Sequence, residues 1–262
     1  RPPGGAVMSR ISKALVGGRK LVCFVTAGYP TAELSVEHAL ACVEGGADVI
    51  ELGVPFSDPV ADGKVIQHTS QKALENGTTP MMVFDLARDI RKRTDAPIVL
   101  MGYYNPIFQI GEDRYAQLSA RSGVDGLIVP DLPCEESLTL SERCRARGLD
   151  LIQLVGPTTP ASRMRKIAAA SSGFLYVVSS LGTTGARGSL SGSVSEVVRR
   201  AKDSAGDLPI GVGFGISRRE HAEAMYHEGA DAAIVGSAIL QGIIDGASPE
   251  DTRRFVAGLK GA

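Results

Sequence analysis

The feature that most constrains the fold is a short pattern that recurs along the chain. A glycine able to end a helix is followed within a few residues by an aspartate and an apolar run, at 45–50, 123–128 and 229–234. Glycine often ends helices because it adopts backbone conformations that other residues resist. Each copy therefore predicts a helix stop followed directly by a strand, and its recurrence indicates a repetitive architecture.

Eight apolar, β-type runs alternate with segments long enough for helices. Such runs are typical of parallel strands buried on both faces, which need helical crossovers between them. The sequence therefore predicts a single-domain α/β fold, a (β/α)8 TIM barrel with an extra N-terminal helix at 8–15. An open doubly wound sheet is the alternative, but the similarity among even-numbered strands favours a barrel built by duplication. The predicted strands are 21–26, 48–52, 97–102, 125–129, 149–155, 173–179, 209–213 and 232–236.

Composition sets the domain count and the broad class of partner. The 262 residues contain no Pro/Ser-rich linker, so we expect one catalytic domain at 8–262 after a disordered extension at 1–7. A net charge of -1 without Lys/Arg runs argues against nucleic acid or a membrane surface as a partner. With no apolar run of about 18 residues and no signal-peptide pattern, a cytoplasmic protein is expected.

The cysteines and histidines show no spacing typical of a metal site. No C-x-x-C or H-E-x-x-H motif is present, so we expect neither a metal site nor a disulfide framework. The residues concerned are Cys23, Cys42, Cys134, Cys144, His38, His68, His221 and His227.

Glu51 contradicts its apolar surroundings. Strand side chains alternate, so Glu51 shares a face with Val49 and points into packed interior at the end of its strand. A loop rich in Gly and Pro then leads to Asp62, which places two acids at the ends of one shaped segment. Both acids are catalytic candidates. The alternative is structural: Glu51 caps a helix and Asp62 is an ordinary turn residue.

Glycine-rich turns follow the last strands of the predicted barrel. In this fold the active site lies at the carboxyl ends of the strands, and phosphate often binds after strands seven and eight. Gly213, Gly215, Gly236 and Ser237 stand there, with Ser237 opening a helix whose N-terminus favours an anion. Each turn could also be only a tight turn.

One further loop and two tyrosines are predicted to lie toward the same end of the barrel. The loop at 179–191 after strand six, which contains Thr184 and Gly185, is long and glycine-rich enough to serve as a lid. Tyr103 and Tyr176 are either apolar walls for a flat aromatic substrate or core aromatics.

With these residues assembled, the chain resembles the alpha subunit of tryptophan synthase from Met8 onward. The resemblance implies cleavage of indole-3-glycerol phosphate to indole and glyceraldehyde 3-phosphate, a carbon-carbon lyase reaction of tryptophan biosynthesis with no cofactor in this subunit. It also implies a partner, the pyridoxal-phosphate-dependent beta subunit, which receives indole within an alpha-beta-beta-alpha heterotetramer. We expect the loop at 53–59 to form part of that contact, because its residues Val54, Pro55, Phe56 and Pro59 are apolar; the alternative is that they tuck inward. The motifs that carry the resemblance are ELGVPFSDPVADG at 51–63, LMGYYNPI at 100–107, PDLP at 130–133, TTGARG at 183–188, GFGIS at 213–217 and VGSAI at 235–239.

The resemblance also implies roles for individual residues. Glu51 matches the catalytic acid/base and Asp62 the group that binds the indole N–H, while Thr184 matches a lid threonine. The phosphate cradle is matched by Gly185, Gly213, Gly215, Gly236 and Ser237. Lys64 departs from the family pattern, because many relatives have proline directly after the ADG of the catalytic loop.

Two other functions remain open at this point. A ribulose-phosphate-binding barrel isomerase or synthase would share the phosphate turns, but it often needs a lysine on an early strand, and strand one here ends Thr26-Ala27-Gly28. A non-catalytic subunit that only activates a partner would be expected to lack Glu51 or Asp62, and both are present.

Overall fold

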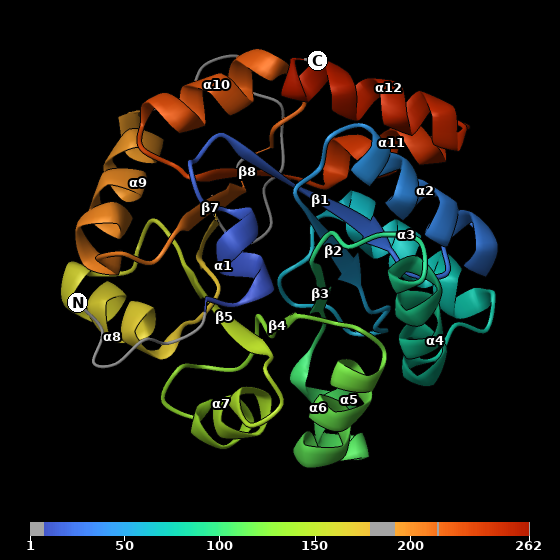
Figure 1. The fold of residues 1–262 in the computed structure, drawn as a ribbon, viewed down its shortest axis with the longest axis horizontal. Helices are drawn as coiled ribbons and strands as arrows, with labels where there is room; N and C mark the ends of the chain where they lie inside the picture. The colour runs from blue at the N-terminus through green and yellow to red at the C-terminus, as the bar shows by residue number, and fades with distance from the viewer. Residues whose placement is uncertain (1–7, 179–191, 214, 262) are drawn as a thin grey trace.

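A closed barrel of eight parallel strands forms the centre of the protein. The computed structural model describes residues 8–178, 192–213 and 215–261. The strands pair in chain order and β1 pairs with β8, so that the sheet has no free edge (Figure 1). They are β1 Lys20–Thr26, β2 Val49–Gly53, β3 Ile98–Met101, β4 Gly126–Ile128, β5 Asp150–Val155, β6 Leu175–Val178, β7 Ile210–Gly213 and β8 Ala232–Val235. The predicted fold is confirmed, and each predicted strand end lies within two residues of the observed one.

Helices surround the barrel, and several connections hold two of them. Pairs of helices follow β2, β3 and β8, and the second helix of each pair was not predicted from the sequence. The helices are α1 Arg10–Ala14, α2 Ala32–Glu44, α3 Lys64–Glu75, α4 Pro80–Arg91, α5 Tyr104–Ile110, α6 Glu112–Arg121, α7 Leu138–Arg145, α8 Ala161–Ala170, α9 Gly192–Ala205, α10 Arg219–His227, α11 Ser237–Ile244 and α12 Pro249–Lys260.

The predicted N-terminal helix is present as α1, and it closes one end of the barrel. It begins after Ser9, whose hydroxyl accepts the backbone N–H of Ser12. Figure 1 shows α1 lying across the barrel opening that faces the viewer. Ile11 and Leu15 are fully or almost fully buried there, against side chains that point inward from the strands. Because α1 closes this end, any site for a substrate must lie at the other.

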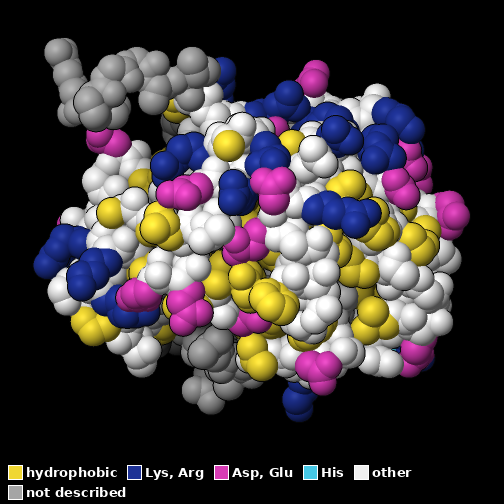
Figure 2. Space-filling view, turned by 90° about the horizontal axis from the view of Figure 1, so that it is seen from below, with side chains coloured by type: hydrophobic (Ala, Val, Ile, Leu, Met, Phe, Trp, Pro, Cys, Tyr) yellow, Lys and Arg dark blue, Asp and Glu magenta, His cyan; other side chains and the backbone are white. Residues whose placement is uncertain are grey.

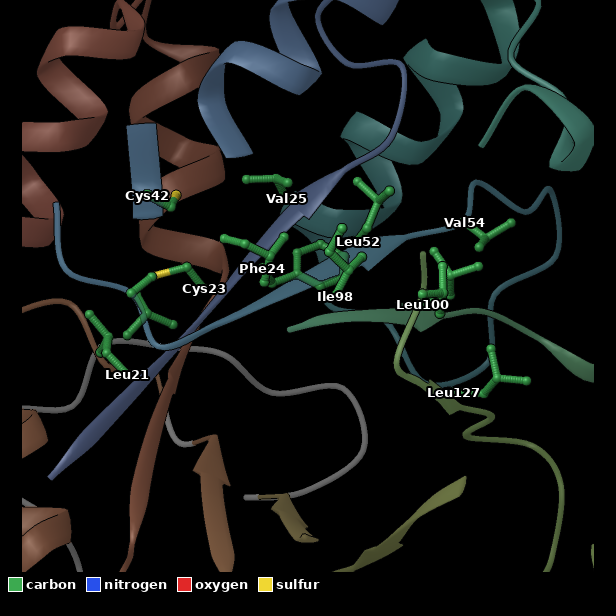
Figure 3. Packing of buried hydrophobic residues seen from close by; sticks show 14 of the residues in the cluster. Leu21, Cys23, Phe24, Val25, Cys42, Leu52, Val54, Ile98, Leu100 and Leu127 are labelled. Atoms are coloured by element: carbon green, nitrogen blue, oxygen red, sulfur yellow. The ribbon is translucent and has the colours of Figure 1, made fainter. Parts of the chain in front are cut away.

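Outward-facing side chains of the strands form the larger core beneath the helices. Alternation along β1 sends Cys23 and Val25 outward, and Cys42 of α2 packs in the same cluster. Figure 3 shows this layer around β1 to β4, continuing through Leu52, Leu100 and Leu127. All four cysteines are free, as expected, and three are buried, which fits packing rather than redox chemistry.

The recurring glycine-aspartate pattern joins neighbouring strands at the N-terminal end of the barrel. Asp48, Asp125 and Asp231 each precede an even-numbered strand and accept a backbone N–H from the start of the strand before it, at 2.9 Å in all three cases. Before β6 the hydroxyl of Ser172 takes the same place, accepting the N–H of Leu151 at 2.9 Å. The repeat therefore has a structural role, because it caps strand donors that the ladder leaves unpaired.

Charges of both signs are mixed on the face seen in Figure 2. Lys/Arg and Asp/Glu side chains lie beside one another, and apolar side chains gather toward the lower part of that view. Among the described residues, no helix is both long and apolar enough to cross a bilayer.

Candidate active site

Glu51 lies inside the barrel with no exposed surface. It is paired in register with Phe24 of β1 and Val99 of β3, and it lies two residues along β2 from Val49, whose side chain belongs to the inward-facing cluster that packs against α1. Within the described chain neither carboxyl oxygen has a hydrogen-bond partner. Burial, reinforced by the charge of Asp62, raises the pKa of Glu51 to about 8. The predicted inward position is confirmed, and the helix-capping alternative is wrong.

Asp62 stands at the end of the loop that leaves β2, half-buried and close enough to Glu51 to perturb it. Burial raises the pKa of Asp62, and the hydroxyl of Tyr103 opposes that shift as a hydrogen-bond donor. The same hydroxyl accepts the backbone N–H of Ala61 at 3.0 Å. Tyr103, the residue before α5, therefore supports the segment that carries Asp62.

Tyr176 reaches the same region from β6, on the opposite side of the barrel. It is almost completely buried, and burial together with the charges of Glu51 and Asp62 raises its pKa. A β-carbon built on Gly213 would lie 3.1 Å from the Tyr176 hydroxyl oxygen. Because glycine at 213 has no side chain, the hydroxyl of Tyr176 can lie against the backbone at that position. The structure brings Glu51, Asp62, Tyr103 and Tyr176 together at one end of the barrel.

A small cavity of about 20 Å³ opens beside Asp62. That volume suits about one water molecule. The lining is mostly apolar, and its polar groups are Asp62, Thr26, Ser70 and the hydroxyl of Tyr103. The full lining is Phe24, Thr26, Gly53, Val54, Asp62, Ile66, Ser70, Met101, Gly102, Tyr103 and Pro130.

The glycines expected to hold phosphate lie at the carboxyl ends of β7 and β8, which are neighbours in the barrel. Gly215 has a φ of +60°, a left-handed conformation that favours glycine. Gly236 precedes α11, and Ser237 is the first residue of that helix. A β-carbon on Gly236 would lie 3.1 Å from Cβ of Phe24, which lines the cavity beside Asp62. Thr184 and Gly185 lie outside the described residues, as does the loop predicted to be a lid.

The sequence interpretation missed the polar residues of α3 that face this site. Ser70 is buried, and its hydroxyl accepts the N–H of Phe56 at 3.0 Å. Thr69 is fully buried and shares a 2.7 Å hydrogen bond with Thr26. Helical spacing from Ile66 through Ala73 places Thr69 and Ser70 on the inner face of α3. Polar residues on the inward face of a predicted helix were the signal in the sequence that could have revealed them.

Lys64, the departure from the family pattern, is the first residue of α3 and is exposed. The helix forms without proline at this position, and Gly63 precedes it with no side-chain cap. Across the described parts of the chain, no group of three or more His, Cys, Asp or Glu side chains is arranged to hold a metal ion.

Comparison with known proteins gives the family. The family profile described as tryptophan synthase alpha chain matches residues 13–258. The chain belongs to this family. The chain is 48% identical to the tryptophan synthase alpha chain of Methanosarcina mazei over 226 residues, which cover 86% of this chain and 82% of the relative. The alpha chain of Dehalococcoides mccartyi is 42% identical, with 97% and 98% covered.

Solved structures of the tryptophan synthase family have the same fold. A structure of the a2b2 complex from Pyrococcus furiosus aligns with a TM-score of 0.88 at 38% identity, covering 94% of this chain and 99% of that one. Tryptophan synthase from Mycobacterium tuberculosis gives a TM-score of 0.90 at 33% identity, with 97% and 98% covered. Membership in the alpha chain family removes the alternative of a ribulose-phosphate isomerase.

Proposed function

We propose that this chain is the alpha subunit of tryptophan synthase and cleaves indole-3-glycerol phosphate to indole and glyceraldehyde 3-phosphate at the carboxyl end of the barrel. The observation that carries the site assignment is the pairing of a fully buried carboxyl, Glu51, with a second acid, Asp62, at the ends of one loop. A carboxyl with a pKa near 8 is largely protonated at neutral pH and is ready to act as an acid.

A single group, the Glu51 carboxyl, can carry out both proton transfers of the reaction. Glu51 donates its proton to C3 of the indole ring and becomes a carboxylate. As the bond from C3 to the glycerol chain breaks, the adjacent hydroxyl becomes the aldehyde and gives its proton to Glu51. The residue ends in the state in which it began, so these transfers need no cofactor from this subunit.

Asp62 stabilises the charge that this step creates. Protonation of C3 places positive charge on the indole nitrogen, and a fixed carboxylate beside that nitrogen lowers the barrier. Tyr103 holds Asp62 in place through Ala61 and donates toward its carboxylate, which favours the ionised form. Tyr176 and Tyr103 would form walls for the ring, and Thr184 would close over it.

The phosphate binds at the other side of the barrel mouth in this proposal. Gly213, Gly215 and Gly236 would leave backbone N–H groups accessible to the anion, and Ser237 opens α11, whose N-terminus carries partial positive charge. Gly185 is proposed as the fifth member of this cradle.

Replacing Glu51 tests the assignment. Glu51→Gln keeps the shape of the side chain but removes the proton, so indole release from indole-3-glycerol phosphate should fall by roughly 10²–10⁴-fold. Glu250→Gln, which changes an exposed glutamate of α12 paired with Arg253, is the matched control and should keep full activity. Glu51→Gln with activity near that of the control would refute the role of Glu51.

The beta subunit is the partner, as in the a2b2 complex of the Pyrococcus furiosus relative. Of the apolar residues in the loop at 53–59, Val54 and Pro55 are buried in the subunit, whereas Phe56 and Pro59 are partly exposed. Large exposed apolar side chains instead follow β2, β3 and β4 as Val60, Phe108 and Leu138, which are 75%, 66% and 67% exposed. We propose these residues as part of the contact with the beta subunit.

The location and the domain limits complete the proposal. A charged phosphate ester does not cross a bilayer unaided, so we place the enzyme in the cytoplasm with the reactions that make its substrate. Residues 8–262 would form one catalytic domain, preceded by an extension at 1–7.

A further inference from the structure

The loop that connects the two catalytic acids is held by hydrogen bonds at both ends, to β3 at its start and to α3 at its end. At its start the N–H of Val54 donates to the carbonyl of Met101 at 2.8 Å, which extends the pairing of β2 with β3. At its end the Gln67 side chain donates to the carbonyl of Asp62 at 2.8 Å. The position of Asp62 therefore also depends on what holds the middle of the loop.

Ser70 holds the middle of this loop through hydrogen bonds. Its hydroxyl oxygen accepts the N–H of Phe56 at 3.0 Å and lies 3.4 Å from the carbonyl oxygen of Phe56, to which it donates. One side chain thus serves both backbone groups of a loop residue. Ser70 is only 4% exposed, and a buried hydroxyl is costly unless it is hydrogen-bonded. Its place on the inner face of α3 is explained by this contact.

Phe56 links Ser70 to the segment that carries Asp62. Its ring stacks on the ring of Tyr103, with centroids 5.1 Å apart and planes at 29°. The hydroxyl of Tyr103 accepts the N–H of Ala61, the residue before Asp62. Ser70, Phe56, Tyr103 and Ala61 therefore form a continuous series of contacts that ends at the proposed indole-binding acid.

We propose that Ser70 is a positioning residue for Asp62, acting through Phe56 and Tyr103 on the geometry of the loop. This inference rests on the proposed function of Asp62. A carboxylate displaced by about 1 Å can cost on the order of 10²-fold in rate. Because the phosphate cradle lies on β7 and β8, loss of the Ser70 contact should weaken catalysis and leave phosphate binding unchanged.

The first test measures the loop directly and does not depend on activity. Amide hydrogen exchange is followed at Phe56 and Ala61 in the wild type, in Ser70→Ala and in Ser119→Ala. Ser119 is a fully buried serine of α6 that donates to the carbonyl of Tyr115 at 2.9 Å, so it matches Ser70 in burial and chemistry but lies elsewhere. Ser70→Ala should speed exchange about tenfold or more at both amides, and Ser119→Ala at neither. Faster exchange at Phe56 alone would overturn the proposed link to Asp62.

The second test is a double-mutant cycle in the complex with the beta subunit. Ser70→Ala and Tyr103→Phe should each lower kcat for cleavage about tenfold, while inhibition by glycerol 3-phosphate, which carries only the phosphate end, stays unchanged. Since both side chains hold the same loop, the double variant should lose much less than the product of the two losses. Multiplicative losses, or a raised KM with unchanged kcat in Ser70→Ala, would overturn the proposal. An inactive wild type would instead refute the proposed function, and the exchange result would still stand.

Discussion

The hydroxyl of Tyr103 accepts the backbone N–H of Ala61 at 3.0 Å, which ties the residue before α5 to the residue before Asp62. The next residue, Tyr104, donates its N–H to the side chain of Asp131 at 2.9 Å, so the start of α5 is also held by the loop after β4. The same short helix carries the exposed ring of Phe108. The catalytic loop and the proposed partner surface therefore share one element, and a partner that presses on α5 would act on Asp62.

Replacing Phe108 tests the partner surface. Phe108→Asp puts a charge into an apolar contact and should weaken the complex with the beta subunit by at least tenfold, because a buried charge without a partner is costly. Met81→Asp is the control, since Met81 is also exposed, at 44%, but lies on α4. Binding is measured by titration with the beta subunit. Equal affinities for the two variants would place the interface elsewhere.

Replacing Gly53 tests the packing of the end of β2 against the ring of Phe24. A β-carbon there would lie 2.4 Å from Cζ of Phe24, and a β-carbon on Gly236 would lie 3.1 Å from Cβ of the same residue. Gly53→Ala should therefore destabilise the protein by about 1–3 kcal/mol. Adding Phe24→Leu removes the clashing atom and should recover part of the loss in urea unfolding.

A second glycine supplies the comparison for this experiment. Gly258 lies within α12 with no neighbouring atom near its missing β-carbon, so Gly258→Ala should be neutral or stabilising. If Gly53→Ala is as stable as Gly258→Ala, the ring of Phe24 is free to move, and the contact does not constrain the site.

The repeated aspartate predicts a stability effect at the end of the barrel away from the site. Asp125 accepts the N–H of Ile98 at 2.9 Å and pairs with Arg91 at 2.6 Å, with its side chain 15% exposed. Asp125→Ala leaves the N–H of Ile98 without its acceptor and removes the carboxylate beside Arg91, so it should cost about 2 kcal/mol in unfolding free energy. Asp113→Ala, which removes a 60% exposed partner of Arg147, should cost under about 1 kcal/mol. Equal losses would mean that the repeat does not stabilise the strands.

Most of the barrel was predictable from local patterns, because each strand is a short apolar run that ends at a turn. The position of Glu51 followed from alternation along β2, and the placement of the glycine-rich turns after β7 and β8 followed from the order of the strands. These inferences need only the order of elements along the chain and the period of the strand.

Contacts that depend on distant segments were not predictable in the same way. The hydroxyl of Ser70 can bond to the backbone of Phe56 only when α3 packs against the loop, and the sequence does not show that packing. Val54 and Pro55 looked available for a partner because apolar loop residues were assumed to be exposed, yet both are buried in the folded subunit. The aspartates of the repeat were visible in the sequence, but their acceptor role depends on the register between neighbouring strands.

The last prediction concerns the stability of the protein as a function of pH. Burial and Asp62 raise the pKa of Glu51 from an ordinary value near 4.5 to about 8, so the folded protein holds a proton that the unfolded chain releases in this range. Folding is then favoured by the proton at low pH, and the contribution of Glu51 becomes steadily less favourable as pH rises from about 4.5 to 8. Glu51→Gln is neutral at every pH and lacks this dependence. The free energy of unfolding of Glu51→Gln, measured in urea at pH 5.5 and pH 8.5, should therefore rise relative to the wild type between the two values, whereas Glu250→Gln should show no such gain. A constant difference between Glu51→Gln and the wild type would mean that Glu51 titrates alike in the folded and unfolded states, and it would remove the basis for its action as an acid at neutral pH.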